Sequence, residues 1–134
     1  MSKALTIMQT APIIPVLAID NIDYAVPLAK ALVAGGLRVL EITLRTPVAL
    51  AVMRAIADAV PEAIVGAGTM STPEHFKQVI DAGCVFGISP GLPDALIEAH
   101  RAYPDFVFLP GVMTPTELMT ARLAGYREVK LFPA

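Results

Sequence analysis

The sequence predicts an α/β fold with parallel strands, and three observations lead to this class. Short runs rich in β-branched residues alternate with longer segments in which apolar residues have helical spacing. Threonine-proline pairs precede several helical segments and glycines follow them, so that the pattern repeats about every 20 to 25 residues. Strands that alternate with helices in this way leave a (β/α)8 barrel or an open, doubly wound sheet as the architecture.

Six short, largely apolar runs are the candidate strands. Each is bounded by turn-forming residues and is too short for a helix. They span residues 13–18, 39–44, 63–67, 85–89, 106–109 and 129–132.

The segments between these runs have apolar residues three and four positions apart, as an amphipathic helix requires. Val26, Leu28, Ala29, Leu32 and Val33 form one such set, and Val48, Val52, Met53 and Ile56 form another. Each segment is long enough to connect two parallel strands.

Three helices are expected to begin with the same pair of residues. Thr46-Pro47, Thr72-Pro73 and Thr114-Pro115 each offer a hydroxyl for the N-cap and a proline for the first helical position. Helix ends are expected at Gly35-Gly36, Gly83 and Gly125, where a residue in the left-handed conformation closes a helix.

Composition argues against several classes of partner. Ten Lys and Arg residues against twelve Asp and Glu give a net charge of −2 with no basic stripe, so nucleic acid is not an expected partner. The apolar stretch at residues 11–19 contains two prolines and is too short to cross a bilayer, so we expect no membrane segment. Cys84 is the only cysteine, which fits a reducing cytoplasm.

The length of the chain does not match a closed barrel. Such a barrel takes about 250 residues and rarely fewer than about 200, whereas these 134 residues hold six candidate strands. We therefore expect residues 1–134 to be a single domain that is the N-terminal part of a barrel, with the last βα units absent.

Lys130 is the first candidate for chemistry. In the last strand Glu128, Lys130 and Phe132 alternate with Val129 and Leu131, so Lys130 faces either solvent or the interior. A solvated lysine on an edge strand is the simpler interpretation. In the interior, loss of water disfavours the ammonium form and leaves free amine that can attack a ketone carbonyl.

Glu41 is the second candidate, because a carboxylate is unusual within an apolar strand. By alternation it shares a side with Thr43 and Arg45. Glu41 and Arg45 either form an ion pair with little effect on stability, or act as a proton shuttle and a carboxylate clamp.

Further signals lie where the strands end. Residues 66–69 (Gly-Ala-Gly-Thr) would let a ligand approach the backbone, and residues 89–91 (Ser-Pro-Gly) and Pro110-Gly111 have turn chemistry. In a barrel these positions share with Glu41 and Lys130 the C-terminal end of the strands, where active sites form. His75 and His100 have no neighbours at metal-ligand spacing and are expected at the surface.

Four motifs resemble, in order and spacing, the bacterial 2-keto-3-deoxy-6-phosphogluconate/4-hydroxy-2-oxoglutarate aldolase family. They are residues 39–46 (VLEITLRT), 64–69 (IVGAGT), 88–91 (ISPG) and 129–134 (VKLFPA). The similarity extends from about Pro12 to Ala134 and so covers nearly all of the sequence, but only part of a family member. It implies a (β/α)8 barrel, of which this chain supplies about the first six strands.

The resemblance also implies roles for individual residues. Lys130 matches the family's Schiff-base lysine, and Glu41 matches its general acid and base. Arg45 and Thr69 match positions that bind the carboxylate of pyruvate.

Two further positions follow from the resemblance. Pro90 and Phe132 match residues that shape the pyruvate pocket. The family's phosphate site follows its seventh and eighth strands, which have no counterpart here. No cofactor and no metal are implied, because an iminium supplies the electrophile.

The sequence is therefore interpreted as a class I aldolase, a lyase that forms pyruvate from 2-keto-3-deoxy-6-phosphogluconate (KDPG) and from 4-hydroxy-2-oxoglutarate (KHG). The family implies a homotrimer with small 2-keto acids as ligands, and the single cysteine indicates the cytoplasm. The alternatives are a 2-keto-3-deoxy-6-phosphogalactonate aldolase, a barrel epimerase or isomerase in which Glu41 acts without covalent chemistry, and a catalytically silent fragment.

Overall fold

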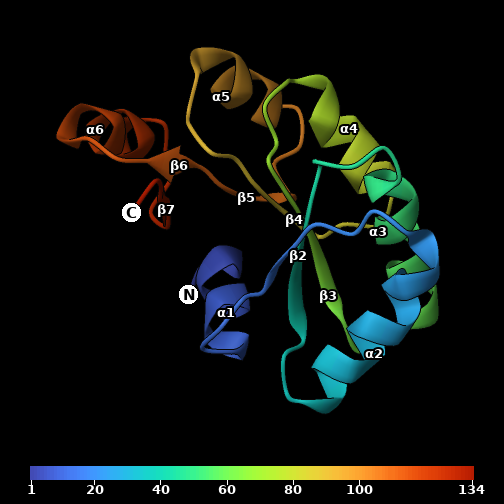
Figure 1. Ribbon diagram of the computed structural model, residues 1–134. Helices are drawn as coiled ribbons and strands as arrows, with labels where there is room; N and C mark the ends of the chain where they lie inside the picture. The colour runs from blue at the N-terminus through green and yellow to red at the C-terminus, as the bar shows by residue number, and fades with distance from the viewer.

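The computed structural model describes residues 1–134 and contains a five-stranded parallel sheet. Its strands follow one another in chain order (Figure 1): β1 (Val16–Leu17), β2 (Val39–Thr43), β3 (Ile64–Gly68), β4 (Phe86–Ile88) and β5 (Val107–Leu109). A doubly wound sheet reverses direction at an inner strand, whereas a barrel adds each strand beside the last. The order β1-β2-β3-β4-β5 is therefore that of a partial (β/α) barrel.

The two remaining strands form a second, smaller sheet. It contains β6 (Gly111–Val112) and β7 (Lys130–Leu131), which run parallel with Gly111 opposite Lys130. Each of the six predicted runs thus overlaps a strand, but the prediction of a turn at Pro110-Gly111 was wrong, because Gly111 begins β6 directly after β5. The strand that carries Lys130 pairs only with β6.

Helices follow the strands, as predicted, and the alternation places most of them on one side of the sheet. Figure 1 shows α2, α3 and α4 covering one face, while α1 lies against the other. The helices are α1 (Lys3–Thr10), α2 (Ala25–Ala34), α3 (Ala49–Ala59), α4 (Glu74–Asp81), α5 (Asp94–His100) and α6 (Pro115–Leu123), with a 3-10 turn, η1 (Ile22–Tyr24), before α2. No helix has the length and hydropathy needed to cross a membrane.

Alternation along β2 divides the core into two clusters. Leu40 and Ile42 point toward the helices and belong to a cluster of 20 buried residues. Val39 points the other way and belongs to the inner cluster, which consists of Val39, Phe86, Ile88, Val107 and Leu109. Glu41 is two residues after Val39 and therefore lies on the same inner face. Because all five residues of β2 are buried, its carboxyl lies among apolar side chains.

The predicted helix starts were right at one of the three pairs. At α6 the Thr114 hydroxyl accepts from the amide of Glu117, and the Glu117 carboxylate accepts from the amide of Thr114, so the two form a capping box. At α3 the prediction was wrong, because the Thr46 hydroxyl donates to the carbonyl of Ile19 and Val48 is the N-cap.

The prediction for Thr72-Pro73 was also wrong, because the N-cap of α4 is Pro73 and not Thr72. The helix ends were predicted correctly. Gly36, Gly83 and Gly125 all have positive φ, between 90° and 97°, directly after a helix.

Helix α1 was not predicted. It has no fully buried residue, and its eight residues have only a weak apolar stripe, so the sequence pattern is faint. Ser2 caps it by accepting from the amide of Leu5 at 3.0 Å. Ala4 and Ile7 pack against the inner cluster, which places α1 over the inner face.

Candidate active site

Strand β2 fixes the position of the Glu41 carboxylate on the inner face. The residue is only 3 % exposed. A Cβ atom on Gly68 of the neighbouring strand would lie 2.1 Å from Glu41 Oε1, so a glycine at position 68 is what leaves room for this side chain. The glycine was predicted to admit a ligand, but the space above it holds Glu41.

Strand β7 brings Lys130 to the same place. Its Nζ lies 3.6 Å from Glu41 Oε1, and the two side chains are 29 % and 4 % exposed. This is an ion-pair distance, longer than the ~2.9 Å of a direct N–H···O hydrogen bond. Lys130 Nζ also lies 5.0 Å from the centroid of the Phe132 ring. Lys130 is therefore directed at Glu41 and is not a solvated edge lysine.

The surroundings of Glu41 affect its protonation. Burial raises the pKa of the Glu41 carboxyl, and the positive charges of Lys130 and Arg45 offset part of that increase. A carboxyl with a raised pKa exchanges its proton more readily near neutral pH than an exposed one, which suits a general acid and base.

A cavity of about 250 Å³ adjoins the pair. Its walls are mainly apolar, and its polar groups are those of Glu41 and Lys130. The remaining lining residues are Met8, Ile14, Val16, Ile88, Leu109 and Val129. A small ligand in this cavity would meet an amine and a carboxyl in mainly apolar surroundings.

Arg45 does not share a strand face with Glu41 as predicted. Strand β2 ends at Thr43, and Arg45 lies in the following turn, where it is exposed. Thr43 is fully buried, and its hydroxyl donates to the carbonyl of Leu17. The guanidinium of Arg45 is still close enough to contribute to the electrostatics of Glu41.

Thr69 directly follows β3 and has a positive φ of 62°, the only non-glycine residue with a positive φ. A β-branched residue rarely adopts this left-handed conformation, which costs about 1 to 2 kcal/mol. Backbone strain of this kind is common in functional sites, where surrounding contacts maintain it.

The remaining predicted residues lie further out. Pro90 follows β4 and is exposed, and Phe132 follows β7 and is 38 % exposed. Ser89, for which the sequence indicated only turn chemistry, is fully buried, donates to the carbonyl of Gly91 and accepts from the amide of Gly111. Its hydroxyl thus joins the end of β4 to the start of β6. In the sequence, the signal for this role was a serine directly before a proline-glycine pair.

The two histidines differ from the prediction and from each other. His75 is half-buried, and its Nδ1 accepts from the amide of Ser71 at 3.0 Å. His100, also expected at the surface, is likewise half-buried. Its ring stacks on Phe76, and its nitrogens contact the Tyr126 hydroxyl and the Phe106 carbonyl, each at 2.9 Å. No three or more His, Cys, Asp or Glu side chains converge as a metal site would require.

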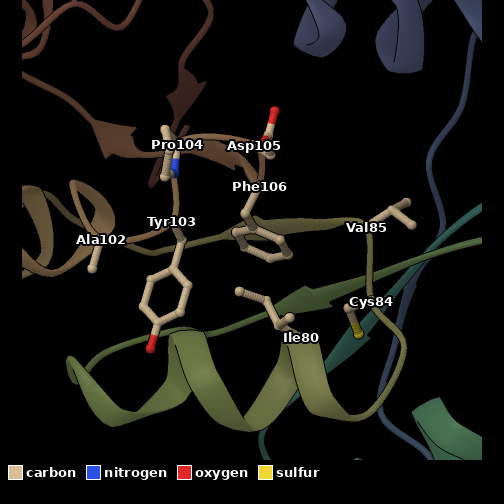
Figure 2. Close-up of a pocket in the computed structure, with 8 residues that line it drawn as sticks. All are labelled: Ile80, Cys84, Val85, Ala102, Tyr103, Pro104, Asp105 and Phe106. Atoms are coloured by element: carbon tan, nitrogen blue, oxygen red, sulfur yellow. The ribbon is translucent and has the colours of Figure 1, made fainter.

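A second hollow lies at the opposite, N-terminal end of the strands. Figure 2 shows Cys84 beside Ile80 and Phe106 in this groove of about 440 Å³. Burial raises the pKa of the Cys84 thiol to about 12, so the thiol stays protonated and unreactive at neutral pH. The groove brings together no acid and base comparable to Glu41 and Lys130.

Comparisons with known proteins agree with this geometry. The family model described as KDPG and KHG aldolase matches residues 5–134. The KHG/KDPG aldolase of Escherichia coli K12 is 48 % identical over 133 residues, which are 99 % of this chain and 62 % of that protein. The chain therefore spans about three fifths of the length of this relative.

Solved structures have the same fold. A KDPG aldolase from Legionella pneumophila, with pyruvate captured as a covalent carbinolamine intermediate, has a TM-score of 0.95 and 41 % identity over 99 % of this chain and 64 % of its own. A KDPG aldolase from Zymomonas mobilis with 3-phosphoglycerate has a TM-score of 0.93 and 44 % identity over 98 % and 62 %. The strand order, the paired lysine and carboxylate, and these matches show that the chain belongs to the KDPG and KHG aldolase family.

Proposed function

We propose that this protein is a class I aldolase in which Lys130 forms a Schiff base with a 2-keto acid and Glu41 transfers the protons. The observation that carries this proposal is the 3.6 Å distance between Lys130 Nζ and Glu41 Oε1 in an apolar cavity. The covalent pyruvate carbinolamine in the Legionella pneumophila relative supports it, because a carbinolamine forms when an amine adds to a ketone.

The first stage forms the imine. Glu41 accepts a proton from the Lys130 ammonium, and the free amine attacks the C2 carbonyl of the substrate. The carbinolamine oxygen is then protonated and leaves as water, which produces a protonated imine. The raised pKa of the Glu41 carboxyl favours this exchange of protons between two groups 3.6 Å apart.

The second stage breaks the bond between C3 and C4. Glu41, through a water, removes the proton of the C4 hydroxyl, and an aldehyde forms as the C3–C4 electron pair moves toward the iminium nitrogen. The resulting enamine takes a proton at C3 from the same carboxyl. Hydrolysis of the imine then releases pyruvate and regenerates the amine.

Four further residues complete the proposed site. Arg45 and Thr69 bind the substrate carboxylate, since a guanidinium and a hydroxyl at the ends of β2 and β3 both suit an anionic oxygen. Pro90 and Phe132 provide apolar walls beside Lys130, and the 5.0 Å distance from Lys130 Nζ to the Phe132 ring supports this role for Phe132.

The proposed substrates are KDPG, cleaved to pyruvate and glyceraldehyde 3-phosphate, and KHG, cleaved to pyruvate and glyoxylate. The name of the Escherichia coli relative includes both compounds. We also propose a cytoplasmic homotrimer. Side chains such as Met119, Leu123 and Leu131, which are 64 %, 89 % and 65 % exposed, support contacts between subunits.

The test is reductive trapping. The protein is incubated with pyruvate and sodium borohydride, and the modified peptide is identified by mass spectrometry. Lys130 should be labelled, Lys130→Met should abolish labelling, and Lys77→Met, which changes an exposed lysine of α4, should not. An epimerase or isomerase without covalent chemistry would give no adduct.

The same experiment is repeated on a chain extended to the length of the relatives, since residues 1–134 span 62 % of the Escherichia coli protein. Labelling in the extended chain alone would mean that the additional residues are needed to assemble the site. The absence of an adduct in both chains would overturn the aldolase proposal.

A further inference from the structure

The strand that carries Lys130, β7, forms few backbone hydrogen bonds with the rest of the molecule. Lys130 donates its amide to the carbonyl of Pro110 at 2.9 Å, and Phe132 donates to Val112 at 3.1 Å. No ladder connects β7 to β2, which carries Glu41. The separation of the amine and the carboxylate therefore depends on side-chain contacts that hold β7 in place.

One such contact comes from the other end of the chain. The Ser2 hydroxyl donates to Glu128 Oε1 at 2.7 Å, two residues before Lys130. The Ser2 hydroxyl oxygen also accepts from the amide of Leu5 at 3.0 Å and so caps α1. A hydroxyl has one hydrogen and two lone pairs, so Ser2 fills both roles at once.

Helix α1 is itself fixed to the inner face. Ala4 and Ile7 pack on the inner cluster, and Met8 lines the cavity beside Glu41 and Lys130. Through its hydrogen bond to Glu128, Ser2 therefore connects the segment leading into β7 to α1. Because α1 packs on the inner face, this bond helps to hold β7 against the same face on which Glu41 lies. The Glu128 carboxylate also lies at the N-terminal end of α1, where the helix dipole favours a negative charge.

We propose that Ser2 and Glu128 are positioning residues for imine formation, joined by a hydrogen bond that we call the latch. The latch ties β7 to α1 and thereby holds the Lys130 amine at its working distance from Glu41. This inference rests on the proposed function. It assigns the latch an effect on the rate of the chemical step and not on pyruvate binding, because neither residue lies among the groups proposed to hold the substrate carboxylate.

Paired variants separate the latch from its surroundings. Ser2→Asp keeps an acceptor for the helix cap but places a second carboxylate beside Glu128, and Glu128→Met removes the acceptor at similar length. Ser2→Thr and Glu128→Gln keep the hydrogen bond. Asp105→Asn is the control for docking of α1, since it weakens the exposed Lys3–Asp105 ion pair without touching the latch.

The readout is the rate of borohydride trapping at Lys130 over a range of pyruvate concentrations. Ser2→Asp and Glu128→Met should lower the rate at saturating pyruvate about tenfold, well below the ~100-fold that a 1 Å misplacement can cause. The half-saturating pyruvate concentration and the final labelled fraction should stay within about twofold, because binding and folding are retained. The double variant should be no slower than the slower single variant, because one bond is lost.

Three results would overturn the inference: trapping by Glu128→Met at the rate of Glu128→Gln, slowing by Asp105→Asn as large as that by Ser2→Asp, or additive losses in the double variant. Amide hydrogen exchange measured without pyruvate tests the latch independently of catalysis, so failure of the latch inference can be told apart from failure of the aldolase proposal. Faster exchange in the peptide with Lys130 is expected in Glu128→Met and not in Glu128→Gln. Unlabelled wild-type protein would instead count against the proposed function.

Discussion

The two residues of the proposed catalytic pair lie in regions that are built differently. Glu41 belongs to the five-stranded sheet, in which every residue of β2 is buried between helices and the inner cluster. Lys130 belongs to the C-terminal segment, residues 111–134, whose buried hydrophobic residues are only Val112 and Ala121. Close packing sets the position of the carboxylate, whereas a few hydrogen bonds set the position of the amine.

This difference indicates where each region is vulnerable. A change of volume in the sheet meets closely packed atoms, so it lowers stability or displaces a neighbouring side chain. A change in the C-terminal segment meets solvent on one side, so it affects local order more than global stability. Glycines and helix caps offer ways to test both statements.

Gly66→Ala should have the largest effect on stability. The added Cβ would lie 2.1 to 2.3 Å from three ring atoms of Phe86, which belongs to the inner cluster. We expect a loss of about 3 kcal/mol in the free energy of unfolding, because overpacking in a filled core forces strands or rings to shift. Urea denaturation followed by circular dichroism measures this loss.

Gly91→Ala is the matched control, since no atom lies within 4 Å of its added Cβ and its φ is not positive. It should change the free energy of unfolding by less than about 0.5 kcal/mol. Equal losses at both positions would contradict the view that packing against Phe86 excludes a side chain at position 66.

Gly68→Ala should act on chemistry more than on stability. Its Cβ would lie 2.1 Å from Glu41 Oε1, and the flexible glutamate can move away, so the fold survives while the carboxyl is displaced. We expect solvent deuterium to enter the methyl group of pyruvate about 100-fold more slowly, the scale of losing a general base. Proton NMR of pyruvate measures the exchange, and an unchanged rate would mean that Glu41 does not transfer this proton.

Much of the sheet region could be predicted from the sequence, because burial imposes a simple pattern on it. Apolar runs located the strands, and glycines with positive φ located the helix ends. The hydroxyl caps were predicted less well. Thr46 has the correct chemistry for a cap, but the structure offers it the carbonyl of Ile19, and a local rule cannot anticipate a partner 27 residues away.

The site was predicted unevenly for the same reason. Alternation and the family motifs singled out Glu41 and Lys130, which the structure brings together. Alternation failed for Arg45, because the strand ends two residues earlier. The role of Gly68 depends on a side chain from the neighbouring strand, and the role of Ser2 depends on a partner 126 residues away. Contacts of this kind follow from the fold and not from local sequence.

A smaller effect is expected in the C-terminal segment from Thr114→Ala. This change removes the hydroxyl that caps α6 and costs about 1 kcal/mol of helix stability. Because α6 buries only Ala121, the loss should appear as faster amide exchange in α6, with no change in the sheet. Thr120→Ala is the control, because its hydroxyl only donates to the carbonyl of Thr116 within the helix. Slower folding or a lower Tm for the whole protein would show that the two regions are not independent.

The smallest effect should come from the protonation of Glu41 itself, measured as the pH dependence of stability. Burial raises the pKa of this carboxyl above 4.5, so the folded state binds its proton more tightly than the unfolded state does. The stabilisation from the protonated form is complete below pH 4.5 and is lost as the pH rises through the folded pKa. Glu41→Gln has no such proton, so the stability of the wild type relative to this variant should decrease as pH rises across that window, by urea denaturation at a series of pH values. A relative gain with rising pH would mean that the attraction of Lys130 outweighs burial, and the carboxylate would then be held mainly by its ion pair and not by the packing of the sheet.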